Sequence, residues 1–128
     1  MPLFTTSDVL CEGLPNVVKR HEVCARAVRQ AVRALGLRTV AAEEVAAPVV
    51  TVFYLPDGIY EKDFRAEMLS RWGVAIGNGE IGDDNVRIGT MGTGAQPEYV
   101  LATVAAVEDA LRRFGHRFAQ GAGVRAAL

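Results

Sequence analysis

Residues 97–115 carry the pattern that most narrowly limits the folds open to this 128-residue chain. Pro97 opens the segment, Gly115 closes it, and apolar side chains recur between them at spacings of four and three: Val100, Val104, Val107, Leu111 and Phe114. This spacing predicts an α-helix with one apolar face, because proline suits a first turn and glycine a C-terminal stop. Such a face must be buried against a second layer of structure, which the rest of the chain has to supply.

Two more segments show the helical period. Residues 16–36 place one apolar stripe opposite three arginines, with Val17, Cys24, Val28, Ala31, Val32 and Leu35 on the stripe and Arg26, Arg29 and Arg33 on the other side. Residues 60–72 repeat a large apolar side chain at every fourth position: Tyr60, Phe64, Met68 and Trp72. Gly36 and Gly73 stand at the ends of these segments, so the sequence predicts three amphipathic helices.

Short β-branched or aromatic runs lie between the helices, at 49–55, 74–77 and 86–89, with a weaker one within 37–45. Runs of this composition, bounded by turn residues, are typical of strands. The order predicts an α+β fold, a two-layer sandwich whose small, mostly antiparallel sheet has helices packed on one face. We expect a single domain over 1–128, with loosely held ends at 1–12 and 116–128 because neither end shows a period.

The composition narrows the function classes. A formal net charge of -1 without a basic stripe argues against nucleic-acid binding. The longest apolar run contains a proline and is too short to cross a bilayer, and the first residues do not resemble a signal peptide. Cys11 and Cys24 have neither metal-binding nor redox spacing. We therefore expect a cytoplasmic protein with no nucleic-acid or membrane partner.

Two familiar motifs lack the context that their chemistry requires. The letters GNGEIG match G-x-G-x-x-G, but two acidic residues and a strand follow where a dinucleotide site needs a helix N-terminus. A flexible hairpin loop over 77–85 fits better. His21 and the glutamate after it resemble the start of a zinc-protease helix, yet Ala25 stands where the second ligand belongs. Neither His21 nor His116, which we expect to be solvated in the tail, has an identifiable partner, so no metal site is expected.

Arg87 lies between Val86 and Ile88 in the run 86–89. Because successive side chains on a strand point to opposite faces, burial of these two apolar neighbours under the helices would turn Arg87 to the other face. There it is either a solvated surface charge or a ligand-binding group in a cleft covered by another body. A guanidinium suits a carboxylate, since two parallel charge-assisted hydrogen bonds fix both position and orientation. The alternation alone does not choose between the two interpretations.

With these segments described, the chain resembles the small C-terminal domain of class V, fold-type I pyridoxal-phosphate aminotransferases, of the alanine–glyoxylate, serine–glyoxylate and pyridoxamine–pyruvate type. Three stretches carry the resemblance in the family's order: EGLPNVVKRHEVCARAVRQAVRALGL with its arginine–histidine pair, VVTVFYLPDGI, and RWGVAIGNGEIGDDNVRIGTMG. The resemblance covers about residues 12–115. Thr90 departs from the family, which often has histidine at that position.

The resemblance implies that Arg87 binds the substrate's α-carboxylate. It also implies a large domain ahead of this one, which holds the lysine that binds pyridoxal phosphate. This chain has only Lys19 and Lys62, expected on the polar side of a helix and in a water-exposed acidic turn. Neither position offers the desolvated pocket that activates a lysine. We therefore expect no catalytic residue in this chain and neither cofactor binding nor activity by the chain alone.

The implied function is amino-group transfer between an amino acid and a 2-oxo acid such as glyoxylate or pyruvate. The implied partners are a large-domain aminotransferase subunit or a second copy of the chain in a homodimer. An orphan non-catalytic module, used for assembly or for sensing a small carboxylate, is the main alternative, because the core is close to the ferredoxin-like sheets of regulatory amino-acid-binding domains. A complete small enzyme has the least support, since no nucleophile–base pair can be placed from the sequence.

Overall fold

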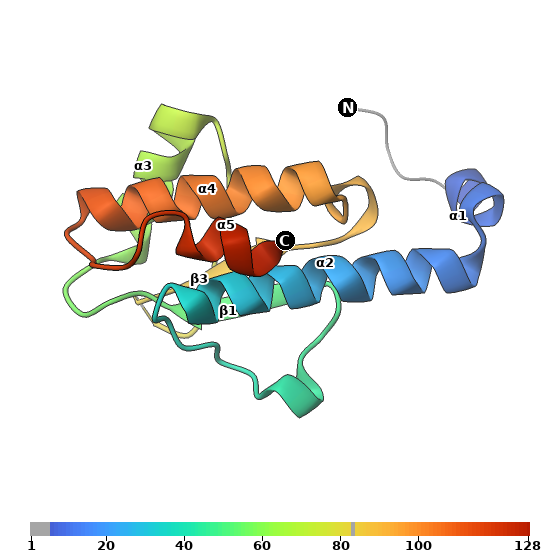
Figure 1. Ribbon diagram of the computed structural model, residues 1–128, viewed down its shortest axis with the longest axis horizontal. Helices are drawn as coiled ribbons and strands as arrows, with labels where there is room; N and C mark the ends of the chain where they lie inside the picture. Colours follow the sequence, from blue (N-terminus) through green and yellow to red (C-terminus); the bar gives the residue numbers. More distant parts are fainter. Residues whose placement is uncertain (1–5, 83) are drawn as a thin grey trace.

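The computed structural model describes residues 6–82 and 84–128. Within them, three antiparallel strands form one sheet in the order β1-β3-β2, with bounds Val50–Tyr54 (β1), Gly77–Asn78 (β2) and Asn85–Gly89 (β3). The helices are α1 (Thr6–Glu12), α2 (Leu14–Ala34), α3 (Glu61–Trp72), α4 (Pro97–Arg113) and α5 (Ala122–Ala127), and two short 3-10 turns cover Glu43–Val45 and Gly92–Gly94. Figure 1 shows α2 and α4 running alongside each other in front of the sheet, with α5 between them. The two-layer α+β sandwich is confirmed.

The strand register separates a buried face of the sheet from an open one. Thr51 pairs with Ile88 and Phe53 with Val86, and all four side chains are buried beneath the helices. The alternate pair, Val52 and Arg87, faces the other way and is only partly covered. The helices therefore occupy one face of the sheet, as the sequence predicted.

The apolar stripes of α2 and α4 form most of the core. The large side chains that are almost fully buried are Val28, Val32, Leu35, Phe53, Phe64, Met68, Val86, Val107 and Leu111. Gly36, Gly73 and Gly115, at the predicted stops, all have positive φ values, which glycine adopts without strain.

Four side chains depart from the predicted helix faces, and one of them, Phe114 at the end of the 97–115 stripe, is 38% exposed. Arg29 was expected opposite the stripe of α2, but it is buried and its guanidinium forms a bidentate pair with Glu43 at 3.0 and 3.1 Å. Tyr60 and Trp72 are largely exposed because they stand at the two ends of the helical pattern, beyond the core. Trp72 instead donates a hydrogen bond from Nε1 to Asp109 on α4.

Both ends of the described chain contain short helices that the sequence did not predict; residues 1–5 lie outside the described part. Residues 6–12 form α1, and residues 122–127 form α5, which packs between α2 and α4. The buried carboxylate of Glu108 on α4 accepts the backbone N–H groups of Gly121 and Val124, which satisfies the start of α5. His116 is also not fully solvated, because its Nε2 lies 2.7 Å from the carbonyl oxygen of Leu35.

The strand bounds differ from the predicted ones at the sheet edges. The run 74–77 contributes only its last residue to β2, because the Val74 N–H bonds to the carbonyl of Met68 at the end of α3 instead of to a strand. The weak run within 37–45 gives a single bridge, Thr39 to Phe53, and then turns away. Its backbone still follows β1, since the Val40 N–H donates to the carbonyl of Val52.

Candidate carboxylate-binding site

Arg87 lies at the centre of the open face of the sheet. It is on β3, the middle strand, between Val52 of β1 and Gly77 of β2. Its side chain is 45% exposed, whereas Val86 and Ile88 are buried. The predicted orientation of Arg87 is therefore confirmed, and the group is neither beneath the helices nor enclosed by them.

The guanidinium of Arg87 lies against the backbone of Gly77. A β carbon added to Gly77 would stand 3.0 Å from Nε and 3.1 Å from Nη2 of the arginine. Real β carbons are rarely found so close to another heavy atom, so the observed place of the guanidinium depends on the absence of a side chain at residue 77. Glycine at this position orients the arginine along the sheet.

Among the described residues, one carboxylate approaches this guanidinium. Oε1 of Glu80 lies 3.7 Å from Nη1 of Arg87, and the glutamate side chain is 72% exposed. An exposed pair at this distance contributes little to stability, on the order of 0–1 kcal/mol. No hydrogen bond joins the Arg87 guanidinium to another residue in the described part of the chain, so its donors can be offered to an incoming acid.

The loop between β2 and β3 is closed by Asn85. The buried side chain of Asn85 donates to the carbonyl of Ile81 at 2.6 Å and accepts the Ile81 N–H at 3.3 Å. A β carbon at Gly79 would overlap the side-chain oxygen of Asn85, so the loop folds tightly over this residue. The sequence predicted a flexible loop and did not reveal that Asn85 closes it by hydrogen bonds to Ile81. Asp83 of this loop lies outside the described residues. The strand β3 follows the loop, so the dinucleotide motif has no helix, as expected.

An open hollow of about 590 Å³ surrounds Arg87 on this face. Its lining residues come from β1, β3 and the segments beside them: Val49, Val50, Ala75, Ile76, Gly77, Arg87, Gly89 and Met91. Arg87 is the charged residue among them, and the others present apolar side chains or glycine backbone. Small-ligand pockets typically have this size and this combination of apolar walls with few polar anchors. The hollow suits a small carboxylate with a short apolar body.

Thr90 does not reach this hollow. Its side chain is buried on the helix side of the chain, and its hydroxyl donates to the carbonyl of Pro48 at 3.3 Å. Its N–H also donates to the carbonyl of Val49 at 2.7 Å. Thr90 therefore contributes to the packing behind the hollow and not to its lining.

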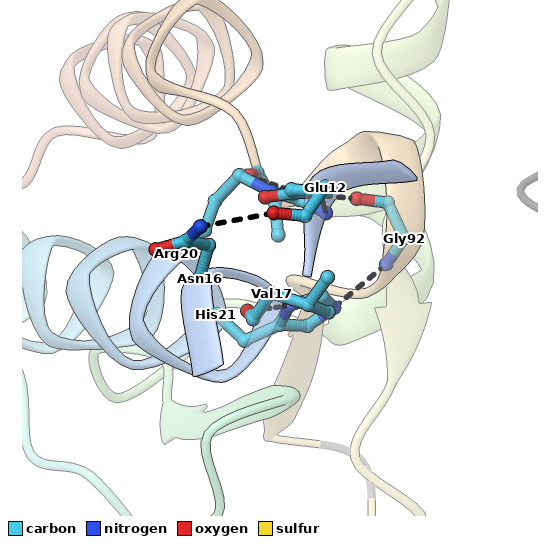
Figure 2. A network of polar contacts seen from close by, with 7 residues as sticks. Glu12, Asn16, Val17, Arg20, His21 and Gly92 are labelled. Carbon is cyan, nitrogen blue, oxygen red and sulfur yellow. Dashed lines mark hydrogen bonds and ion pairs between the residues drawn. The ribbon is translucent and has the colours of Figure 1, made fainter. Parts of the chain in front are cut away.

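The turn after Thr90 is held from behind by two adjacent side chains of α2 (Figure 2). The Gly92 N–H donates to Nε2 of His21 at 2.9 Å, and Nη1 of Arg20 donates to the carbonyls of Gly92 and Ala95, both at 2.7 Å. Nδ1 of His21 lies 2.7 Å from the carbonyl of Val17. Because Nε2 accepts a hydrogen bond, the ring proton of neutral His21 is placed on Nδ1, which donates to Val17.

Arg20 is itself fixed by Glu12 at the end of α1. Its Nε and Nη2 donate to the two carboxylate oxygens at 2.8 and 3.1 Å, a bidentate arrangement. These hydrogen bonds lower the pKa of the Glu12 carboxyl below its usual value. The sequence revealed no partner for His21 and gave no direct indication of this network of hydrogen bonds. Its one available signal was the adjacency of an arginine and a histidine on a helix, opposite a turn rich in glycine.

No protein-family model matches the chain. A pyridoxamine–pyruvate transaminase of Mesorhizobium japonicum is 40% identical over 122 residues, which make up 93% of this chain and 31% of the relative. The crystal structure of pyridoxamine-pyruvate aminotransferase from Mesorhizobium loti aligns with a TM-score of 0.87 at 38% identity, covering 92% of this chain and 31% of that one. The crystal structure of ureidoglycine-glyoxylate aminotransferase from Bacillus subtilis aligns with a TM-score of 0.87 at 33% identity, covering 93% and 31%.

The chain is a small C-terminal domain of the class V aminotransferases. It spans about a third of the length of the curated aminotransferases that it matches. The family resemblance inferred from the three sequence stretches is thereby confirmed.

Aminotransferases use pyridoxal phosphate, and the described residues of this domain do not fit that cofactor. Lys19 and Lys62 are both exposed, whereas the lysine that forms a Schiff base works in a desolvated pocket. The described residues also contain no cluster of three or more histidine, cysteine, aspartate or glutamate side chains that could hold a metal. No helix among them is both long enough and apolar enough to cross a bilayer.

Proposed function

We propose that this domain supplies the substrate-carboxylate arginine, Arg87, to a class V aminotransferase. The observation that carries the proposal is a half-exposed guanidinium in an apolar hollow, for which Gly77 leaves room and to which Glu80 is the one carboxylate close by among the described residues. The substrate class is a small amino acid and its 2-oxo acid partner, such as glyoxylate or pyruvate. Family membership supports this assignment, since two of the relatives are named for these 2-oxo acids.

In this role Arg87 would bind and orient the α-carboxylate through two parallel hydrogen bonds. The apolar walls of the hollow would exclude water from one side of the substrate, which strengthens the charged contact. Pyridoxal phosphate supplies the electron sink for amino-group transfer, and its lysine and binding groups would come from the other two thirds of the enzyme. That part would belong to the same polypeptide or to a separate large-domain subunit. Alternatively, a second copy of the chain would cover the open face of the sheet.

A chimeric enzyme tests the proposal. The matching C-terminal third of the Mesorhizobium japonicum transaminase is replaced by this chain, and pyruvate-dependent amino transfer is measured. We expect Arg87→Gln to weaken the apparent affinity for pyruvate by roughly thirtyfold, since losing a bidentate charged pair costs about 2 kcal/mol. Arg26→Gln, which removes an exposed arginine on α2, is the matched control. An unchanged affinity in the Arg87 variant would show that another group binds the carboxylate.

A non-catalytic carboxylate-binding module is the second candidate. One observation favours it: the hollow and its arginine are formed by this chain alone. Sodium pyruvate is therefore titrated into the isolated ¹⁵N-labelled chain at constant ionic strength, with the Arg87 Nε–Hε resonance as the probe. Submicromolar binding without any amino transfer in the chimera would favour the module. Millimolar binding is expected for the aminotransferase domain, because a single ion pair in an open hollow is largely solvated.

A further inference from the structure

The turn that forms one rim of the Arg87 hollow is rich in glycine and is closed by two backbone hydrogen bonds, from the Gly94 N–H to the Met91 carbonyl and from the Ala95 N–H to the Gly92 carbonyl. It runs from the end of β3 to the start of α4 and contains glycine at residues 89, 92 and 94. Met91, whose side chain is 61% exposed, lines the hollow, and Gly92 follows it with a φ of 58°. Glycine loses more conformational freedom on folding than any other residue. Contacts from outside the turn therefore act together with its own two hydrogen bonds to place Met91.

These contacts converge on Gly92. Its N–H is bonded to His21 and its carbonyl to Arg20, so both of its backbone hydrogen-bonding groups are held by consecutive side chains of one helix. The second Arg20 bond, to Ala95, fixes the far end of the turn. Figure 2 shows both side chains reaching the turn from α2, and the bonded residues are more than seventy positions apart in the sequence. Two bonds at 2.7 and 2.9 Å therefore leave Gly92 little room to move.

The hold on Gly92 extends to the first helix. Arg20 is oriented by its bidentate pair with Glu12, the last residue of α1, and its side chain is only 20% exposed. No residue of α1 is buried, and seven residues are too few for a helix to be stable in isolation. The place of α1 is therefore set by its few contacts with α2, of which the Glu12–Arg20 pair is one.

We propose that Arg20 and His21 are positioning residues for the carboxylate site. They fix Gly92 from the helix side and thereby set where Met91 stands at the rim of the hollow, and Glu12 makes that setting depend on the place of α1. The proposal rests on the proposed function in one respect, that the hollow binds a carboxylate. The geometric part, control of Met91 through Gly92, stands on the hydrogen bonds alone.

The test uses the full 128-residue chain with ¹⁵N labelling and ¹³C-labelled methionine methyl groups. His21→Leu removes the acceptor for the Gly92 N–H, and His21→Gln keeps an uncharged acceptor on a side chain of similar reach. His116→Leu is the matched control, because His116 also bonds to a backbone group but lies far from the turn in sequence and contact. Arg20→Gln and Glu12→Gln test the other half of the network. Circular dichroism and thermal unfolding establish that each variant is folded.

We expect amide hydrogen exchange at Gly92 to be at least tenfold faster in His21→Leu, and the Met91 methyl resonance to move toward its random-coil position. Sodium pyruvate should bind three- to tenfold more weakly to this variant. His21→Gln should recover most of each effect, and His116→Leu should show none. Glu12→Gln should shift the Met91 methyl in the same direction as Arg20→Gln, by a smaller amount. If His21→Leu does not fold, the same readouts in Arg20→Gln decide the proposal.

Faster amide exchange at Gly92 with an unchanged Met91 methyl resonance would overturn the proposal. Arg20 and His21 would then stabilise the fold without determining the position of Met91. A direct measurement of the imidazole ¹⁵N shifts adds an independent check: a proton on Nε2 of neutral His21 would contradict the hydrogen bond from Gly92. If the wild-type chain binds no pyruvate at all, the function proposed above fails, whereas the Met91 and Gly92 readouts still decide the positioning role.

Discussion

The guanidinium of Arg87 and the backbone of Gly77 are in contact across two neighbouring strands, and a single β carbon at residue 77 would stand 3.0 Å from Nε. The contact fixes the direction in which the arginine crosses the sheet. It also means that a residue with no side chain determines how the charged group is presented to the hollow.

Gly77→Ala should therefore displace the Arg87 guanidinium while leaving the fold intact. Gly77 does not have a positive φ, so alanine fits the backbone, and the flexible arginine can move aside. We expect pyruvate binding to weaken by roughly three- to tenfold, or about 1 kcal/mol, with little change in the melting temperature. Gly89→Ala is the matched control, because it adds the same methyl group to β3 beside the hollow with nothing within 4 Å. Equal losses in both variants would mean that the methyl acts by filling space and not through Arg87.

Glu80 should compete weakly with an incoming carboxylate for Arg87. It adopts a φ of 63°, a left-handed conformation that is unusual for a residue other than glycine, with its carboxylate 3.7 Å from Nη1. Glu80→Gln should strengthen pyruvate binding up to about threefold at low ionic strength and much less in 0.5 M salt, because the pair is exposed and screened. Isothermal titration at two salt concentrations measures this difference. Glu44→Gln, an equal charge change on an exposed residue, should have no such effect.

Glu43 should make the stability of the domain depend on acid pH. Hydrogen bonds from Arg29 and then Arg33 lower its pKa from the ordinary 4.5 to about 2. Because the folded pKa lies below the unfolded one, the unfolded state binds more protons between pH 4.5 and 2. The stabilisation is present above about pH 4.5 and is lost as the pH falls toward 2. Urea unfolding midpoints across this range should fall more steeply in the wild type than in Glu43→Gln, by a modest amount since the carboxylate is 45% exposed.

Glu43→Gln should also lower stability at neutral pH, because it leaves the buried guanidinium of Arg29 without its ionic partner. The neighbouring Glu44→Gln serves as the control, and it should change neither the neutral-pH stability nor the acid slope. Parallel acid slopes for wild type and Glu43→Gln would assign the pH dependence to other carboxylates, of which Glu12 and Asp109 also have lowered pKa values.

Gly123→Ala should destabilise the domain although alanine favours helices. A β carbon there would meet Oε1 of Glu108 at 2.9 Å and Leu35 and Val104 at 3.1 Å, so α5 would have to move away from α2 and α4. Overpacking of this kind costs about 1–3 kcal/mol, which exceeds the gain in helix propensity of about 1 kcal/mol. Thermal and urea unfolding measure the effect. Ala126→Gly in the same helix isolates the propensity contribution; a more stable Gly123→Ala variant would show that α5 packs loosely.

Local patterns predicted the parts of the fold that depend on period and on turn chemistry. The helical repeats found α2, α3 and α4, and the period of two placed Arg87 opposite Val86 and Ile88. The short element α5 has no period, and it forms because Glu108 and Gly123 make contacts between distant segments. Tertiary contacts also reversed the local expectation at Arg29, which is buried because Glu43 folds back over it.

The candidate site likewise has a part that the sequence predicted and a part that it did not. The sequence identified Arg87 as a candidate carboxylate-binding residue from its strand and from the family resemblance, but it gave no sign of the contact with Gly77. The hold of Arg20 and His21 on Gly92 was equally hidden, because it joins residues more than seventy positions apart through backbone groups, which carry no sequence identity.

The close contact at Gly77 has a consequence for comparing chains of this family. A β carbon at residue 77 would stand 3.0 Å from the guanidinium, so any residue other than glycine there would require the Arg87 side chain to shift by a few tenths of an ångström. The residue that a related chain carries at this position therefore bears on where its arginine lies.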